Sequence, residues 1–244
     1  MTTAYKYGKL AISMGIVKVA AFSISLDGFG AGPRQDLDNP LGVRGLELHT
    51  WFLKTAAFRE IHGHSGGASD GVDNEFAALS FQNVGAWIIG RNMFGPVRRP
   101  WQIDPKTGEE WKGWWGDTPP YHVPVFVLTH HARPLLAMQG GTTFYFVTDG
   151  MESALAQAKD AAGDKDVRIG GGVATIRQYL LAGKIDEMHL ALSPVVLGEG
   201  ESLFAGVNLP KLGFEVAQTT AGEEATHFVL RRNNGTLYGG SSTP

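Results

Sequence analysis

Residues 167–175 read Val167-Arg168-Ile169-Gly170-Gly171-Gly172-Val173-Ala174-Thr175 and join an apolar strand to the start of a helix through three glycines. Glycine lets a ligand approach the backbone closely. The free N–H groups at a helix start favour a phosphate group. The segment lacks the spacing of the G-x-G-x-x-G dinucleotide motif. On local grounds it therefore indicates either a phosphate site or an ordinary tight turn between a strand and a helix.

Two further apolar runs end in polar groups in the same manner. The run Ile88-Ile89-Gly90-Arg91 delivers a guanidinium, which can bind a phosphate through two donors at once. The run Val127-Leu128-Thr129 delivers a hydroxyl, followed by His130. Alone, each of these ends is typical of a turn. Because ligands of open α/β sheets bind at the carboxyl ends of the strands, the three ends together predict one ligand site at that edge.

Strand and helix patterns alternate as far as residue 183, and strands alone follow. The helix patterns include residues 45–60 and 72–83, and the later strand patterns include residues 188–197. This order predicts an α/β fold with a mostly parallel central sheet, helices on both faces and antiparallel C-terminal edge strands. We expect a single domain over residues 17–234, a disordered leader at 1–16 and a disordered tail at 235–244. A tryptophan- and proline-rich insert at 95–122 lacks periodicity, which is typical of a functional loop.

Composition excludes several classes of function. The formal net charge of −3 over 244 residues argues against a general nucleic-acid binder. The chain has no cysteine, which excludes disulfides and thiolate catalysis and fits a cytoplasmic protein. No apolar run approaches the ~20 residues that span a bilayer, so we expect no membrane insertion. His62 and His64 lack the spacing of zinc ligands, and we expect no metal site.

The order of the three strand ends resembles the dihydrofolate reductases. The closer resemblance is to the reductase domain of the bifunctional riboflavin-biosynthesis deaminase/reductase and its stand-alone relatives, through residues 23–29, 185–190 and 193–200. It implies a dihydrofolate-reductase-like three-layer fold and a homodimer formed through C-terminal strands. It also implies an NADPH-dependent reductase that transfers hydride to a C=N or C=O of a small planar heterocycle (a pterin, an aminopyrimidine or a flavin-like ring).

The resemblance implies that cofactor contacts come from the three strand ends. The residues are Gly90, Arg91, Asn92, Met93, Thr129, His130, Gly170, Gly171, Gly172, Val173, Ala174 and Thr175. The chain departs from the family pattern at several of them. Asn92 and Met93 stand where dihydrofolate reductases have Lys or His and then Thr, Thr175 replaces an aromatic residue, and Ala191 replaces a pterin-binding threonine. These departures keep open a non-catalytic nucleotide-binding module, or a flavin-using reductase on the same fold.

Three carboxylates are the candidate catalytic acids, namely Asp27, Asp73 and Glu75. Asp27 is equally typical of an Asp-Gly turn, and Asp73 is favoured as a helix cap. Aromatic faces stack on flat rings, so the candidate substrate contacts are Phe52, Phe76, Trp114 and Trp115. The part of the insert at 111–121 fits either a lid over the site, or a loop folded back on the sheet edge or forming a dimer contact.

Overall fold

The computed structural model describes residues 15–64, 69–95, 101, 103–104 and 107–233. The expected leader at 1–16 and tail at 235–244 lie outside this range, apart from Gly15 and Ile16. The prediction of disorder is wrong for Ile16, because its amide donates to Asp166 Oδ1 at 3.0 Å and its carbonyl accepts from the Val167 amide at 2.9 Å.

A mixed sheet forms the centre of the described chain, with strand order β10-β11-β8-β1-β7-β3-β4-β6-β5. The strands are β1 (Val17–Ile24), β2 (Phe29–Ala31), β3 (Val84–Gly90), β4 (Pro124–Leu128), β5 (Leu136–Ala137), β6 (Thr143–Val147), β7 (Asp166–Gly171), β8 (Glu187–Leu192), β9 (Glu201–Ser202), β10 (Phe214–Ala221) and β11 (Thr226–Arg232). Strands β8, β1, β7, β3, β4 and β6 are parallel, and β11 and β10 continue the sheet as antiparallel strands. The predicted parallel centre and antiparallel C-terminal edge are therefore confirmed.

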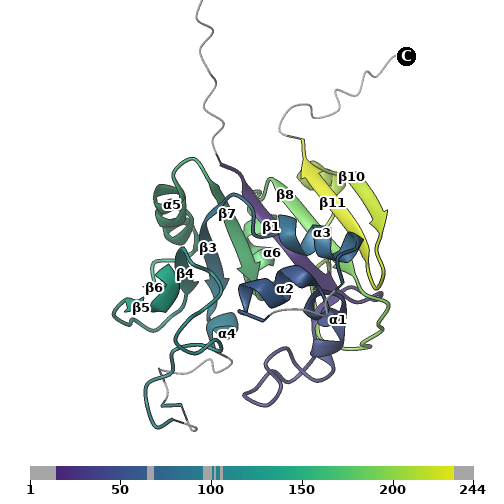
Figure 1. Cartoon of the computed structure of the whole chain (residues 1–244). Coiled ribbons are helices and arrows are strands. Elements are labelled where there is room, and N and C mark those ends of the chain that lie inside the picture. The colour runs from purple at the N-terminus through teal and green to yellow at the C-terminus, as the bar shows by residue number, and fades with distance from the viewer. Residues whose placement is uncertain (1–14, 65–68, 96–100, 102, 105–106, 234–244) are drawn as a thin grey trace, which may run out of the picture.

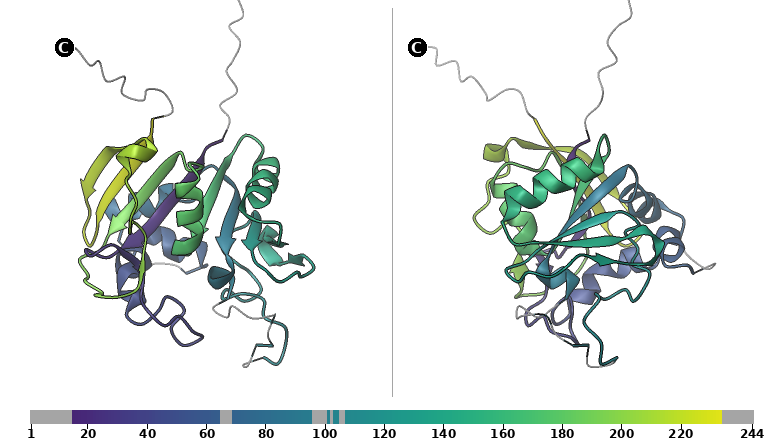
Figure 2. Two further views of the ribbon diagram at one scale, coloured as in Figure 1. Left: turned by 180° about the vertical axis from the view of Figure 1, so that it is seen from behind. Right: turned by 90° about the vertical axis from the view of Figure 1, so that its left-hand side faces the viewer.

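Helices cover both faces of this sheet (Figures 1 and 2). The helices are α1 (Thr50–Leu53), α2 (Ala56–Ile61), α3 (Val72–Leu79), α4 (Arg91–Phe94), α5 (Met151–Ala162) and α6 (Val173–Leu181), with 3₁₀ turns η1 (Gly45–His49), η2 (Gln139–Gly141) and η3 (Pro210–Leu212). Helices α1 to α3 lie on one face, and α5 and α6 lie on the other (Figures 1 and 2). The predicted α/β three-layer arrangement is confirmed.

Local polar groups explain where the sequence prediction of element boundaries is wrong. The helix expected over 45–60 is broken, because Thr55 leaves the helix and caps α2 by accepting from the Phe58 amide at 3.1 Å. The helix expected over 72–83 ends at Leu79, where the Ser80 carbonyl accepts from Arg168 Nη1 at 2.7 Å. The strand expected over 188–197 ends at Leu192, before Pro194, which has no N–H to donate to a ladder.

Short strands were also missed. Strand β5 adds an antiparallel strand at the edge of the sheet opposite β10. Strands β2 and β9 pair with each other outside the main sheet. Strands of two or three residues are too short to show an alternating pattern of apolar and polar residues, so periodicity alone could not reveal them.

Apolar side chains pack on both faces of the sheet. The larger cluster joins the sheet to α5 and α6 and includes Ile88, Ile169 and Ile176. On the opposite face, Trp87, Phe94 and neighbours pack under the insert. Glycine at position 170 is required by this packing, because a Cβ there would lie 2.8 Å from the Trp87 ring. The core thus fixes the strand β7 and the turn that follows it.

Candidate functional site

A cavity of about 770 Å³ opens where the central strands end. Strands β3, β4 and β7 reach it at their carboxyl ends, as expected for a ligand site of an open α/β sheet. All of the residues predicted as cofactor contacts line it: Gly90, Arg91, Asn92, Met93, Thr129, His130, Gly170, Gly171, Gly172, Val173, Ala174 and Thr175. The structure therefore brings the three strand ends of the sequence together at one site.

Glycines at this edge meet different constraints. A Cβ on Gly90 would collide with Thr175 Oγ1, so the close packing of β3 against α6 requires glycine there. Gly172 is different, because it has φ −71° and no heavy atom lies within 4 Å of the position of its Cβ. Among the described glycines, Gly172 alone combines an ordinary negative φ with open space. Neither its φ nor its packing against residues beyond its two chain neighbours requires glycine at this position, whereas a ligand seated on the backbone would.

Helix α6 begins at this turn. The amides of Thr175 and Ile176 both return to the Gly172 carbonyl, at 3.0 and 3.1 Å. The amides of Val173 and Ala174 are then the ones that a helix leaves without an internal acceptor. Because they lie on the cavity wall next to open backbone at Gly172, this turn can receive an anionic group.

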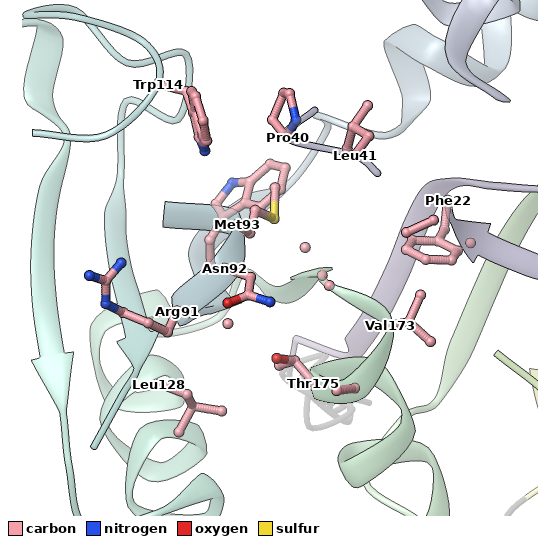
Figure 3. Close-up of a pocket in the computed structure, with 18 of the residues that line it drawn as sticks. Phe22, Pro40, Leu41, Arg91, Asn92, Met93, Trp114, Leu128, Val173 and Thr175 are labelled. Atoms are coloured by element: carbon pink, nitrogen blue, oxygen red, sulfur yellow. The ribbon is translucent and has the colours of Figure 1, made fainter. Parts of the chain in front are cut away.

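Arg91, Asn92 and Met93 form the opposite wall. Figure 3 shows them across the cavity from Phe22, Val173 and Thr175, with the Arg91 guanidinium directed away from that group. This guanidinium lies 4.0 Å from the Trp101 ring centroid and donates to the Gly95 carbonyl at 3.1 Å. Its Nε–H is buried without an acceptor. Burial, with the nearby charge of Arg133, lowers the pKa of Arg91 to about 10, so the side chain is still a cation at neutral pH.

The end of β4 is held by a local turn. Thr129 is 7% exposed, and its hydroxyl accepts from the His131 amide at 3.1 Å. His130 is exposed at the same turn and lines the cavity. The two residues predicted here as cofactor contacts are thus on the wall, with the Thr129 hydroxyl already engaged by its own loop.

The other part of the cavity is aromatic. Phe52 packs edge-on to Phe58 at 5.4 Å and stacks on Phe81 at 6.3 Å, and all three line the cavity. Trp115 stacks on His62 at 5.0 Å between ring centroids. Ala20 and Ala21, at the bulge of β1, lie on the same wall. These surfaces suit a flat apolar ring.

The residues of the insert at 111–121 lie in different surroundings. Trp111 is folded back, because its indole N–H donates to the Phe94 carbonyl at 2.8 Å. Tyr121 is buried against Trp87, with ring centroids 5.0 Å apart. Trp114 and Trp115, in contrast, line the cavity, as predicted for substrate contacts. Residues 96–100, 102 and 105–106 of the insert lie outside the described residues.

The structure places none of the three candidate acids on the cavity wall. Asp27 is exposed and holds the loop that follows β8, because its carboxylate accepts from the amides of Leu197 and Gly198 at 3.2 and 2.7 Å. Glu75 is exposed on α3. Asp73 is buried but turned toward β11, away from the cavity-lining residues. The geometry does not support a catalytic role in direct contact with a ligand for these residues.

Asp73 instead ends a buried chain of hydrogen bonds. The Ala21 amide donates to His189 Nδ1 at 3.0 Å, so His189 carries its proton on Nε2 and donates to His227 Nδ1, also at 3.0 Å. His227 then donates from Nε2 to Asp73 Oδ1 at 2.8 Å. Desolvation, reinforced by His227, lowers the pKa of His189 to about 3, so His189 is neutral at neutral pH.

Phe76 belongs to this chain and not to the cavity. Its ring stacks on His227 at 4.2 Å and on His189 at 4.6 Å, and it is 7% exposed. The prediction of Phe76 as a substrate contact is therefore not supported by its position. Phe52, Trp114 and Trp115 do line the cavity.

Sequence reasoning missed Arg168 and Tyr121, which both line the cavity and are both nearly buried. Arg168 gave a usable signal, because a charged residue within the apolar run of a central strand is rarely buried without a partner. Tyr121 gave none, since it lies in the irregular insert.

Within the described part of the chain, no group of three or more His, Cys, Asp or Glu residues is placed to hold a metal ion. No helix among the described residues has both the length and the apolar character needed to cross a bilayer.

The chain is similar to several known proteins. The uncharacterized protein YyaP of Bacillus subtilis strain 168 is 37% identical over 62 residues, which are 25% of this chain but only about a third (32%) of YyaP. The crystal structure of a putative riboflavin biosynthesis protein from Shewanella sp. PV-4 superposes with a TM-score of 0.53 at 25% identity, covering 90% of this chain and 99% of that one. Dihydrofolate reductase from Enterococcus faecalis, complexed with NADP(H), gives a TM-score of 0.46 at 14% identity over 89% and 97% of the chains.

The model of the RibD C-terminal domain matches residues 18–228. This range contains the three strand ends, the aromatic wall and the buried histidine chain. The match confirms the family that the sequence motifs indicated. Since it spans most of the sequence, the chain belongs to the RibD C-terminal domain family.

Proposed function

We propose that this protein is an NADPH-dependent reductase that transfers hydride to a C=N or C=O of a small planar heterocycle. The observation that carries the proposal is Gly172, where open space faces the cavity at the start of α6. A glycine that neither its φ nor its packing against distant residues requires is explained by a ligand that must approach the main chain. The match to the RibD C-terminal domain supports a nicotinamide nucleotide as the cofactor.

The residues present fit this cofactor. Gly170 to Gly172 and the amides of Val173 and Ala174 would hold the pyrophosphate. Thr129 and His130 would lie along the adenosine end. Arg91 with Asn92 would bind the 2′-phosphate, because the half-buried Arg91 guanidinium has a buried Nε–H without an acceptor among the described residues. NADPH, once bound, supplies the hydride.

The chain itself would supply position and exclusion of water. Phe52, Phe81 and Trp115 form apolar walls on which a flat ring can stack. Ala20 and Ala21 present backbone at the β1 bulge without bulky side chains, so a ring can lie close to the sheet. These surfaces hold the ring and keep bulk water from the reacting face.

We further propose a homodimer through the C-terminal strands. Strand β10 is the edge of the sheet, and its residues are mostly exposed, including Val216 at 60%. An exposed edge strand offers a row of backbone groups for pairing with a second copy. Sedimentation velocity of the wild type and of a Val216→Lys variant tests this proposal, since the charged variant should be monomeric.

NADPH binding and turnover are measured separately. Trp87, Trp114 and Trp115 line the cavity, so addition of NADPH should quench tryptophan fluorescence. Oxidation of NADPH in the presence of a panel of pterins, aminopyrimidines and flavins then tests catalysis. Absence of binding at millimolar NADPH would refute the proposal. Binding without turnover of any ring would favour a non-catalytic module, and turnover only with a tightly bound flavin would favour a flavin-using reductase.

A further inference from the structure

Arg168 is a buried cation with no carboxylate partner among the residues that the structure describes. It is 6% exposed, and within the described chain its guanidinium donates only to neutral oxygens: the Ser80 carbonyl at 2.7 Å, the Ser80 hydroxyl at 3.2 Å and the Ala20 carbonyl at 2.7 Å. Three acceptors meet five N–H donors, and the buried Nε–H has none. A buried charge in a folded protein is normally paired.

Aromatic rings compensate only part of this charge. The guanidinium carbon of Arg168 lies 4.1 Å from the Trp87 centroid and 5.0 Å from the Phe81 centroid. Cation–π contacts attract a cation but satisfy none of its N–H donors. The bond to Ser80 and the bond to Ala20 tie the end of α3 to the β1 bulge, and a neutral side chain could do the same without the cost of a buried charge.

The missing partner can come from the cavity. Arg168, Trp87, Phe81 and Tyr121 all line it, and the charge of Arg168 acts on the Tyr121 hydroxyl, which is a second donor at this wall. The one carboxylate on the described part of the wall is Glu201, on β9, which belongs to the small separate sheet and not to the elements that carry this cluster.

We propose that the aromatic end of the cavity takes a planar anion, whose carboxylate or deprotonated ring oxygen is bound by Arg168 and Tyr121. This inference rests on the proposed function for the ring-binding role of the aromatic wall, but it does not depend on the identity of the cofactor. It narrows the substrate class from planar heterocycles in general to those that present negative charge on the edge that meets β7. A ring with a protonated amidine on that edge would be disfavoured, because it would bring a second cation to Arg168.

Isosteric rings of different charge test the proposal by isothermal titration calorimetry, without NADPH and again with it. Three probes are quinoline-2-carboxylate, its neutral carboxamide and 2,4-diaminopteridine. Lumazine, titrated at pH values below and above the pKa of its ring, shows whether a deprotonated ring oxygen binds as a carboxylate does. We expect the anions to bind at least tenfold more tightly than their neutral forms. Because a hydrogen bond to a charged group is strong, Arg168→Met should reduce this preference by about 10- to 100-fold.

Arg177→Met is the matched control. Arg177 also donates to backbone carbonyls, those of Leu203 and Ala205, at 2.6 and 2.9 Å, but it does not line the cavity. Its loss should leave the preference for anions unchanged. If Arg168→Met does not fold, as judged by urea unfolding, Tyr121→Phe provides the second variant and should lower anion affinity several-fold.

Equal affinity for the carboxylate and the carboxamide, or tighter binding of 2,4-diaminopteridine, would overturn the inference. An undiminished preference in folded Arg168→Met and Tyr121→Phe variants would overturn it as well. Failure of NADPH to bind while the anions still bind would overturn the proposed function and leave this inference standing.

Discussion

Gly172→Ala is the substitution that separates a ligand-binding role of the α6 turn from a structural one. The new Cβ meets no heavy atom within 4 Å beyond its two chain neighbours, and φ −71° lies in the range that alanine adopts. The methyl group would occupy space on the cavity wall beside the amides of Val173 and Ala174. The same change should therefore leave the fold intact and obstruct the proposed site for the pyrophosphate.

The expected free-energy change of Gly172→Ala is small for folding and larger for NADPH binding. Alanine gains about 0.4–1 kcal/mol from a less flexible unfolded chain. Gly172 is also the N-cap of α6, where alanine is worse than glycine by a similar amount. These effects nearly cancel, so the free energy of unfolding should change by less than about 0.5 kcal/mol and Tm by less than about 2 °C. Loss of one charge-assisted hydrogen bond costs about 1.5–3 kcal/mol, which weakens NADPH binding about 10- to 100-fold.

The assay combines urea unfolding, thermal melting and titration of tryptophan fluorescence with NADPH. Gly163→Ala is the control, because Gly163 has φ +63° at the end of α5, has open space around its Cβ and does not line the cavity. That variant should lose about 1 kcal/mol of stability to backbone strain and keep the wild-type affinity for NADPH. A less than threefold change in NADPH affinity for Gly172→Ala would refute the reasoning.

Three further perturbations test other parts of the site. Arg91→Ala should weaken the binding of NADPH by about tenfold or more and that of NADH by less than about twofold, because only NADPH carries the 2′-phosphate. Equal losses of affinity for the two cofactors in titrations would show that Arg91 does not bind the 2′-phosphate. The pKa of His189 is about 3 in the fold and about 6.5 in the unfolded chain, so the unfolded state takes up the proton first and stability is lost as pH falls from about 6.5 toward 3. The loss from this group is about 2 kcal/mol between pH 7 and 5, and urea unfolding of His189→Gln should show a correspondingly smaller loss than the wild type. Asp73→Asn should cost about 1–3 kcal/mol, since an amide N–H would face the donor of His227 or Glu224. Its kcat per folded molecule should stay within about tenfold of that of His189→Gln, which interrupts the same chain of hydrogen bonds. A larger loss in a stable Asp73→Asn variant would restore a catalytic role to Asp73.

The sheet edge could be predicted from the sequence because its determinants are local. At Val167–Thr175, an apolar run ends in glycines and a helix pattern follows. These nine residues alone therefore indicate a strand that leads into a helix. The rule that ligands bind at the carboxyl ends of parallel strands then brings Gly90, Thr129 and Gly172 together without knowledge of their distances. All three line the cavity in the structure.

The acids could not be placed from the sequence because their partners are distant along the chain. Asp73 meets His227 across 154 positions, and which way its side chain turns depends on the pairing of β8 with β11. Likewise, the burial of Arg168 depends on β1 and β3, which flank it in the sheet. Sequence patterns locate elements, whereas the surroundings of a polar side chain depend on neighbours that only the assembled sheet supplies.

The two interactions missed from the sequence converge on one point of strand β1. Arg168 holds the Ala20 carbonyl, and the chain from Asp73 through His227 and His189 holds the Ala21 amide. Ala21 has φ +50°, a conformation that costs an alanine about 1–2 kcal/mol and persists only where its surroundings fix it. Because both residues line the cavity, this bulge forms part of the proposed ring-binding surface. A ligand that binds Arg168 would therefore lie next to the Ala20–Ala21 backbone, which Asp73 holds in place through the two histidines. Asp73, which does not line the cavity, would then act on the proposed ring site by positioning Ala21 and not by proton transfer to the ligand.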